Sequence, residues 1–258
     1  MEAHKRDSKA FKSYKRRKKR TQFLVEKYKI DGIISDNRFG VHYRKVPCVF
    51  ITHQLNVLSG NTTWFSTNIH QNIIKKFDVC WIPDHEFEPN LSGKLGHSNK
   101  TAIIKKYLGP LSRLKVQKQE KQYDLMVLLS GPEPHRTLLE KKITSELKAY
   151  KGTVLFVQGL IENDQIITHD GLICYYNFMK GNELQYAINN SLIILSRSGY
   201  TTVMDLAKMG KKAFFIPTPG QFEQEYLAKR FDDLKMVPTC AQDDFKIEML
   251  EKVKHYSD

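Results

Sequence analysis

Small and polar residues gather where a buried strand gives way to a helix, within residues 191–210. The segment opens with the apolar run from Leu192 to Leu195, breaks at Ser196 to Gly199, and resumes at helical spacing up to Gly210. We therefore expect a strand, a tight turn and a helix. Ligands of open α/β sheets bind at the carboxyl ends of strands, and the free N–H groups of a starting helix attract anions. This turn is a candidate anion site.

Two residues of the same predicted helix add a second kind of chemistry. Thr202 and Asp205 are three positions apart and share a helix face. A carboxylate one turn inside a phosphate-binding helix suits a ribose diol, because it accepts hydrogen bonds from two hydroxyl groups. The alternative interpretation is an ordinary strand–helix unit with a polar loop, and so short a motif leaves both open.

Further polar groups follow other predicted strands. In the stretch from Ser130 to Arg136, a glycine and two prolines shape a rigid turn before a helix, and Arg136 suits a phosphate. Phe178 and Met179 are placed to hold a base, although such residues are more often part of a core. Residues 217–226 bring amides and acids to the first turn of a helix, where they bind sugar hydroxyls or favour the helix dipole.

The composition of the chain indicates its general class and the kind of partner it binds. The chain has 258 residues, of which 41% are hydrophobic and 27% charged, as in soluble globular proteins, but its net charge is +13. Ten of the basic side chains lie in the first twenty residues, which we expect to be helical. Such an excess implies a polyanionic partner. An anionic membrane surface fits better than nucleic acid, because aromatic residues are sparse in this stretch and no recognition motif is present.

Neither a membrane span nor a signal peptide is visible in the sequence. No apolar run approaches the roughly 18 residues that a spanning helix requires. Cys48, Cys80, Cys174 and Cys240 are far apart, so neither a zinc site nor a redox pair is indicated. We expect free thiols in a reducing cytoplasm and no metal.

Strand-like and helical stretches alternate along the chain, which predicts an α/β protein with parallel sheets. A polar stretch at residues 113–122 is interpreted as the linker between two halves. We expect strands at 30–36, 48–51, 77–82, within 100–110, and at 123–129, 153–157, 172–178, 192–195 and 213–217. We expect helices at 1–29, 62–76, 136–150, 181–190, 200–210, 222–231 and 243–255.

The order of these pieces resembles the donor-binding domain of glycosyltransferase family 28, over about residues 123–231. In that family a small-residue turn, a threonine and a helical acid follow a strand, as Ser198, Thr202 and Asp205 do here. A proline-rich loop and a glutamine-containing helix come next, as in residues 217–226. The resemblance implies a GT-B-like fold with two Rossmann-like lobes: a partial N-terminal acceptor-side lobe at 1–118 and a donor-binding lobe at 119–258. The last helix is a candidate to pack back on the N-terminal lobe.

The same resemblance implies a function and a set of residues. The best-known member of the family attaches N-acetylglucosamine to the lipid-linked peptidoglycan precursor. We therefore expect transfer of a hexosyl or N-acetylhexosaminyl group from a UDP-sugar to an acceptor hydroxyl, in cell-envelope or glycolipid synthesis. The expected place is the cytoplasm, peripherally at the inner face of the membrane, where the basic N-terminus meets anionic lipid or a lipid-linked acceptor. No cofactor is expected besides the UDP-sugar donor. The implied donor-binding residues are Ser130, Gly131, His135, Arg136, Phe178, Met179, Arg197, Ser198, Gly199, Thr202, Asp205, Gln224 and Glu225.

The first half resembles only the later strands of the family's N-terminal lobe. Thr52-His53-Gln54 is similar to its acceptor-facing loop, which makes His53 and Asp36 the candidate catalytic bases. Family members begin with a strand and a glycine-rich turn bearing a histidine, whereas this chain begins with the basic stretch. We therefore expect an incomplete N-terminal lobe, as in a fragment or a shortened product. Two alternatives stay open: a UDP-sugar epimerase of related architecture, and a non-catalytic nucleotide-sugar-binding module.

Overall fold

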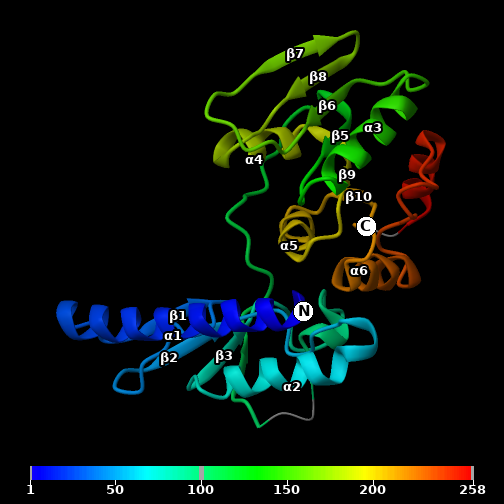
Figure 1. Cartoon of the computed structure of the whole chain (residues 1–258). Helices are drawn as coiled ribbons and strands as arrows, with labels where there is room; N and C mark the ends of the chain where they lie inside the picture. Colours follow the sequence, from blue (N-terminus) through cyan, green and yellow to red (C-terminus); the bar gives the residue numbers. More distant parts are fainter. Residues whose placement is uncertain (1, 99–101, 257–258) are drawn as a thin grey trace. The chain divides into compact units, whose positions relative to one another are not determined.

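The computed structural model describes residues 2–98 and 102–256, which form two compact units, 1–109 and 110–258 (Figure 1). The division falls before the predicted boundary between residues 118 and 119. Residues 110–118 belong to the second unit because its side chains bind their backbone. Lys115 N donates to Oε1 of Gln185 at 2.8 Å, and Gln117 N donates to Oδ1 of Asn189 at 3.0 Å. The predicted linker is thus held along the C-terminal unit.

The N-terminal unit is built on a parallel sheet with the strand order β1-β2-β3-β4. Its described elements are α1 (Glu2–Tyr28), β1 (Ile33–Asp36), β2 (Cys48–Ile51), η1 (Gly60–Thr62), α2 (Thr63–Ile74), β3 (Val79–Ile82), η2 (Gly93–Leu95) and β4 (Lys105–Tyr107). Phe50 and Ile82 of the sheet pack with Ile74 of α2 and with Phe77 in the core of this unit. Each of these side chains is at most 7% exposed, so the hydrophobic effect holds helix and sheet together.

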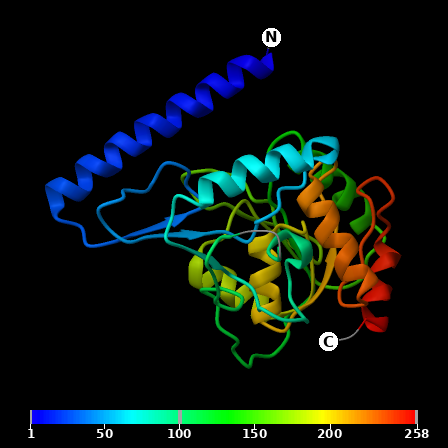
Figure 2. The same ribbon diagram turned by 90° about the horizontal axis from the view of Figure 1, so that it is seen from below.

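The predicted basic helix is confirmed as α1, which runs without a break (Figure 2). It is fixed to its unit by Tyr14, whose hydroxyl lies 3.0 Å from Nε2 of His42 and accepts a hydrogen bond from Lys76 Nζ at 3.1 Å. Most basic side chains between Lys12 and Arg20 are exposed. This stretch of α1 therefore presents positive charge to its surroundings.

The C-terminal unit is built on a sheet with the order β10-β9-β5-β6-β8-β7. Its described elements are β5 (Tyr123–Leu128), α3 (His135–Leu147), β6 (Val154–Val157), β7 (Ile167–Asp170), β8 (Ile173–Tyr176), α4 (Gly181–Asn189), β9 (Ser191–Ser196), α5 (Tyr200–Lys208), β10 (Lys212–Phe215), α6 (Phe222–Asp233) and η3 (Ile247–His255). All strand pairs are parallel except β7 with β8, which form an antiparallel hairpin at one edge (Figure 1). The predicted α/β class is confirmed, and β7 is an addition to it.

The parallel strands of this sheet end at one level. Phe215 of β10 pairs with Ser196 of β9, Ser196 with Leu128 of β5, Leu128 with Val157 of β6, and Val157 with Tyr176 of β8. The loops that follow therefore leave together at the carboxyl edge. Strand order reverses between β5 and β9, because the chain proceeds from β5 to one side of the sheet and returns to the other. Such a reversal is where open α/β sheets bind ligands.

The last helix belongs to the C-terminal core. Ile247, Leu250 and Val253 of η3 lie in one hydrophobic cluster with Leu139 and Ile143 of α3. Its apolar side chains are thus buried within its own unit, and packing of this helix on the N-terminal lobe stays a prediction. It is also a 3₁₀ helix, with a tighter winding than the predicted α-helix.

Candidate functional site

Two helices begin beside the point where strand order reverses. The turn after β5 leads into α3 and contains Gly131, and the turn after β9 leads into α5 and contains Gly199. A Cβ added to either glycine would meet no atom within 4 Å. Among the described residues, no side chain caps the start of α5, whereas Glu133 Oε2 accepts from Thr137 N at 3.2 Å in the first turn of α3. The positively polarised start of α5 thus faces an approaching anion without a capping side chain, and the turn at Gly131 leaves open space beside the start of α3.

A third glycine fixes the packing of the neighbouring loop. Gly159, just after β6, has a φ of +71°, and a Cβ there would lie 2.3 Å from the carbonyl oxygen of Leu129. Only glycine allows the two loops to approach so closely. The sequence analysis missed this residue, although its position two residues beyond the end of a strand was a usable signal.

Arg197 is a buried brace between three loops. Its Nη1 donates to the carbonyls of Ile216 and Pro217 at 3.1 and 2.9 Å, and its Nη2 donates to His135 O and Gln242 Oε1 at 2.9 and 2.7 Å. The side chain is 1% exposed, and burial lowers its pKa to about 10. Both terminal nitrogens of Arg197 are thus occupied, and its contact with the donor stays a prediction. Gln242 was not foreseen from the sequence.

Arg136 is held in a similar way at the start of α3. Its Nε pairs with Glu133 and its Nη1 with Glu140, both at 2.6 Å, while Nη2 donates to Thr137 Oγ1 at 2.7 Å. The residue is 6% exposed. Its charge is balanced by two carboxylates, so it stabilises the turn that carries Gly131. Ser130 in this turn is exposed, and His135 is half-buried.

Asp205 lies on α5 and is half-buried, as is Thr202 one turn before it. The hydroxyl of Ser112 donates to Asp205 Oδ1 at 2.5 Å, and Ser112 Oγ itself accepts from Leu114 N at 3.0 Å. Among the described residues, nothing donates to the second carboxylate oxygen, Oδ2. One face of the carboxylate therefore remains for a ligand hydroxyl. Ser112 was missed because it precedes a stretch that looks like a linker.

The loop after β10 is fixed by the start of α6. Gln224 Oε1 accepts from Thr218 N at 2.9 Å, and Glu225 Oε1 accepts from Gly220 N at 2.8 Å. Ser198, from the turn after β9, donates to the carbonyl of Gln224 at 2.8 Å. The structure thus brings together the predicted turn at 196–199 and the predicted loop and helix start at 217–226. Glu225 also borders a hollow of about 350 Å³ between α6 and residues 239–242.

Phe178 and Met179 follow β8 at the same carboxyl edge and are half-buried. Lys180 Nζ lies 4.7 Å from the centre of the Phe178 ring, and Gln165 Nε2 donates to the Phe178 carbonyl at 2.9 Å. The strands β5 and β6 separate them from the turn after β9. These two side chains therefore lie at the side of the candidate site, away from Asp205.

The candidate bases lie at the corresponding edge of the N-terminal sheet. Asp36 ends β1 and pairs in register with Ile51 of the neighbouring β2, and His53 follows β2. Asp36 is exposed and His53 is half-buried. Beside them, His70 is buried with its Nε2 2.7 Å from Gln54 O, and burial lowers its pKa. The fold thus brings Asp36 and His53 to adjacent strand ends of one sheet.

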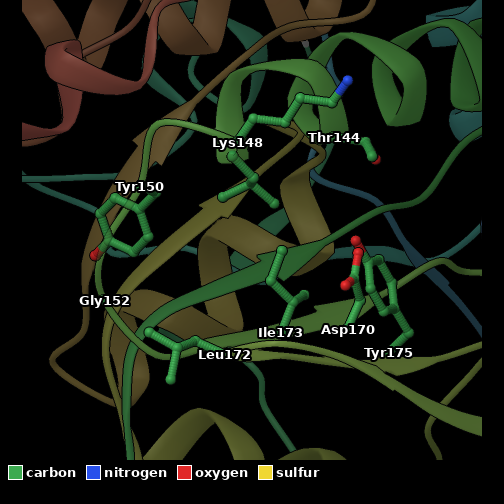
Figure 3. A pocket seen from close by; sticks show the side chains of 9 residues that line it. Thr144, Lys148, Tyr150, Gly152, Asp170, Leu172, Ile173 and Tyr175 are labelled. Carbon is green, nitrogen blue, oxygen red and sulfur yellow. The ribbon is translucent and has the colours of Figure 1, made fainter.

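A separate pocket of about 260 Å³ lies elsewhere on the C-terminal unit (Figure 3). Lys148 and Tyr150 line it from the end of α3 and the following turn, and Asp170 and Ile173 line it from the β7–β8 hairpin. It is away from the carboxyl edge, near the start of β8, and contains no predicted site residue. Over residues 2–98 and 102–256, no cluster of histidine, cysteine or acidic side chains is arranged to hold a metal, and no helix is long and apolar enough to span a bilayer.

Comparison with known proteins identifies part of the chain. Residues 142–255, which lie in the C-terminal unit, match the model of the glycosyltransferase family 28 C-terminal domain. A relative from Haemophilus ducreyi, UDP-N-acetylglucosamine–N-acetylmuramyl-(pentapeptide) pyrophosphoryl-undecaprenol N-acetylglucosamine transferase, is 20% identical over 213 residues. The match covers 79% of this chain but only 57% of that relative.

Solved structures establish the fold. MurG of Acinetobacter baumannii superposes with a TM-score of 0.54 at 15% identity, covering 91% of this chain and 68% of its own. The glycosyltransferase SnogD of Streptomyces nogalater superposes with a TM-score of 0.60 at 11% identity, covering 90% and 66%. The chain therefore has the GT-B-like architecture that the sequence predicted.

Proposed function

We propose that this chain binds the UDP-sugar donor of a glycosyltransferase and contributes to transfer of a hexosyl or N-acetylhexosaminyl group to an acceptor hydroxyl. One observation carries the proposal. Two glycine turns with open space at their Cβ positions flank the strand-order reversal, and the turn at Gly199 lies within residues 142–255, which match the family 28 C-terminal domain model. The donor named for the Haemophilus ducreyi relative, UDP-N-acetylglucosamine, supports a nucleotide sugar as the ligand.

The parts of the donor correspond to different groups at this edge. The diphosphate fits the start of α5 at Gly199, because backbone N–H groups and the helix dipole stabilise negative charge without a buried counter-ion, and the turn at Gly131 leaves open space for it. The free carboxylate oxygen of Asp205 fits a ribose hydroxyl. Phe178 offers an aromatic surface for the base, and Gln224 and Glu225 hold the loop that would face the sugar.

The chemistry follows from charge development on the leaving group. The acceptor oxygen attacks the anomeric carbon, the bond from that carbon to UDP breaks, and the electron pair leaves with the diphosphate. Helix starts that already face this charge stabilise it in the transition state. A base removes the acceptor proton, and Asp36 and His53 are the candidates. In this scheme the helix starts, and no metal or other cofactor, stabilise the leaving diphosphate.

The acceptor side of the proposal rests on α1. Its exposed basic side chains from Lys12 to Arg20 suit an anionic membrane surface or a lipid-linked acceptor at the cytoplasmic face. The acceptor named for the Haemophilus ducreyi relative is linked to undecaprenol through a pyrophosphoryl group. A role in cell-envelope or glycolipid synthesis is consistent with both observations.

Calorimetric titration with UDP and with 2′-deoxy-UDP tests the donor site. We expect UDP to bind more tightly than its deoxy analogue, because Asp205 accepts a ribose hydroxyl. Asp205→Asn should weaken UDP binding by about tenfold, which corresponds to about 1.4 kcal/mol, and should abolish the difference between the two ligands. Asp233→Asn, at the exposed end of α6, is the matched control. A chain that binds no UDP, or an Asp205→Asn variant with unchanged affinity, contradicts the proposal.

Product analysis separates the proposed transfer from its alternatives. A transferase releases UDP only when an acceptor is present and yields a glycosylated acceptor. An epimerase of related architecture converts the UDP-sugar into a new UDP-sugar without an acceptor. Binding of UDP without either product identifies a nucleotide-sugar-binding module.

A further inference from the structure

A corner of the C-terminal sheet remote from the candidate donor site brings two lysines together. It lies at the amino edge, where Tyr123 at the start of β5 pairs with Ser191 at the start of β9. Lys121 precedes β5, and Lys211 lies between α5 and β10. Both side chains extend to the C-terminal end of α4. We call Lys121 and Lys211 the lysine pair.

The two ammonium groups share one acceptor. Lys121 Nζ and Lys211 Nζ both donate to the carbonyl oxygen of Asn189, at 2.5 and 2.9 Å, and Lys211 also donates to Ser191 O at 3.2 Å. Among the described residues, no aspartate or glutamate forms an ion pair with either lysine. The carbonyls at a helix C-terminus attract a cation, but one partial charge does not balance two full positive charges at this spacing.

This arrangement changes the chemistry of Lys211. Desolvation, reinforced by the adjacent Lys121 ammonium, lowers the pKa of Lys211 to about 7. Lys121 is the ionisable side chain that faces it, and the other groups in contact are backbone carbonyls. A lysine beside another cation presents an uncharged amine near neutral pH, and such an amine is a nucleophile.

A buried asparagine also belongs to this corner. Asn190, between the two residues whose carbonyls bind Lys211, is 1% exposed. Neither its Oδ1 nor its Nδ2 has a hydrogen-bond partner in the part of the chain that the structure describes. The Asn190 carbonyl accepts from Gln122 N and Tyr123 N at 2.9 and 3.2 Å, so the residue holds the chain that follows Lys121 at this corner.

We propose that Lys211 is a modification site at which its amine forms a carbamate with carbon dioxide, with the Lys121 ammonium as counter-ion. The Nζ lone pair attacks the carbon atom of carbon dioxide and forms a C–N bond. One C=O π pair moves to oxygen, and one N–H proton passes to water. The product carries a negative charge in place of a positive one. Repulsion between two cations is thereby replaced by an ion pair.

The carbamate would act on the anchoring of residues 110–122. Lys121 holds the end of this segment at α4, and Ser112 near its beginning contacts Asp205. An ion pair at Lys121 strengthens the first of these contacts. The lysine pair lies at the opposite edge of the sheet from the open glycine turns, so its modification leaves the candidate donor groups chemically unchanged.

Trapping of the carbamate tests the proposal on the full chain. The protein is equilibrated with ¹³C-labelled carbon dioxide and bicarbonate near neutral pH, and carbamate oxygens are alkylated with an oxonium reagent. Digestion and mass spectrometry then assign the labelled lysines. We expect about tenfold or more label on Lys211 than on exposed lysines, because only about one in a thousand ordinary lysine amines is neutral at pH 7.

Substitutions of Lys211, of Lys121 and of the neighbouring Lys212 test the proposal further. Lys211→Arg should abolish the trapped product at this position, and Lys121→Gln should reduce it by about fivefold or more, because the counter-ion is lost and Lys211 becomes more basic. Lys212→Arg, the exposed neighbour, should leave trapping on Lys211 unchanged. Labelling of Lys211 no higher than that of exposed lysines, or equal labelling in Lys121→Gln, overturns the proposal. If a variant fails to fold by circular dichroism, the distribution of label in the unmodified chain decides alone.

Discussion

The two edges of the C-terminal sheet hold positive charge in opposite ways. At the carboxyl edge, Arg136 is paired with two carboxylates, and Arg197 donates to three carbonyls and one amide oxygen. At the amino edge, Lys121 and Lys211 share the carbonyl of Asn189 and have no carboxylate partner among the described residues. The cations at the carboxyl edge have many partners, whereas those at the amino edge have few.

The difference follows from the chemistry of the two side chains. The planar guanidinium group of arginine carries five donors and keeps its charge when buried, so it can tie several carbonyls together. A lysine ammonium group loses its proton more readily when it is buried beside another cation. The buried arginines at the carboxyl edge therefore hold the loops in place, and the proposed function assigns contact with the diphosphate to backbone N–H groups at the glycine turns. Lysines without a counter-ion become reactive.

Removal of the Arg197 brace should have the largest effect. Arg197→Met leaves the carbonyls of His135, Ile216 and Pro217 without their donor inside the protein, and we expect the free energy of unfolding to fall by about 3–5 kcal/mol. Urea denaturation followed by circular dichroism measures this loss. Lys208→Met, at the exposed end of α5, is the control and should change stability by less than about 0.5 kcal/mol. Equal stability of the two variants would show that the brace is dispensable.

Two glycine substitutions at the carboxyl edge distinguish a glycine that leaves room for a ligand from a glycine that the packing of two loops requires. Gly199 has an ordinary φ of −69° and open space around its Cβ direction, so Gly199→Ala should keep the fold and weaken UDP binding by about tenfold or more. Gly159→Ala places a methyl group against Leu129 O and should destabilise the protein by about 2–3 kcal/mol. Calorimetry with UDP and urea denaturation measure the two effects.

The two glycine variants are controls for each other. The interpretation requires that the loss of affinity in Gly199→Ala occurs at unchanged stability. Unchanged UDP affinity in that variant would mean that the donor does not approach this turn. Unchanged stability in Gly159→Ala would mean that the loops after β5 and β6 separate easily.

The smallest expected effect is the pH dependence contributed by Lys211. Its folded-state pKa of about 7 lies below the ordinary value of 10.5 expected for the unfolded chain. Between these values the unfolded chain binds more protons, so the contribution of this group to stability increases as the pH rises. Urea denaturation at about pH 7 and about pH 9, in buffer free of carbon dioxide, should show this increase, and Lys211→Gln should reduce it. An identical pH dependence in the variant would indicate that Lys211 has the pKa of an ordinary lysine.

Much of the fold was predictable because its strands are short, apolar and separated by helical spacing. The strand at 48–51 coincides with β2, and the glycine at 210 follows α5 with a φ of +56°, as expected for a helix end. Strand β7 was not predicted because all four of its residues are exposed, which removes the hydrophobic signal. Its pairing with β8 is a tertiary effect.

The position of the candidate site could be predicted from the sequence, but only some of the contacts within it could. Parallel topology brings strand ends to one edge, so the turns at 130–136 and 196–199 were expected there. The binding roles of the thirteen donor residues, and those of Asp36 and His53, stay predictions. The role of Arg197 as a brace depends on acceptors from other loops, and the contact between Ser112 and Asp205 spans much of the unit in sequence. No local pattern carries that information.

The common level at which β10, β9, β5, β6 and β8 end has a consequence for the engineering of specificity. Because the loops all begin at the same level of the sheet, one loop can change in length and composition without displacing the start of a neighbouring loop. Replacement of residues 177–180 would alter the surface offered to a base while the helix starts at Gly131 and Gly199 keep their positions. The edge can therefore be varied one loop at a time, and recognition of the base can be exchanged separately from recognition of the diphosphate.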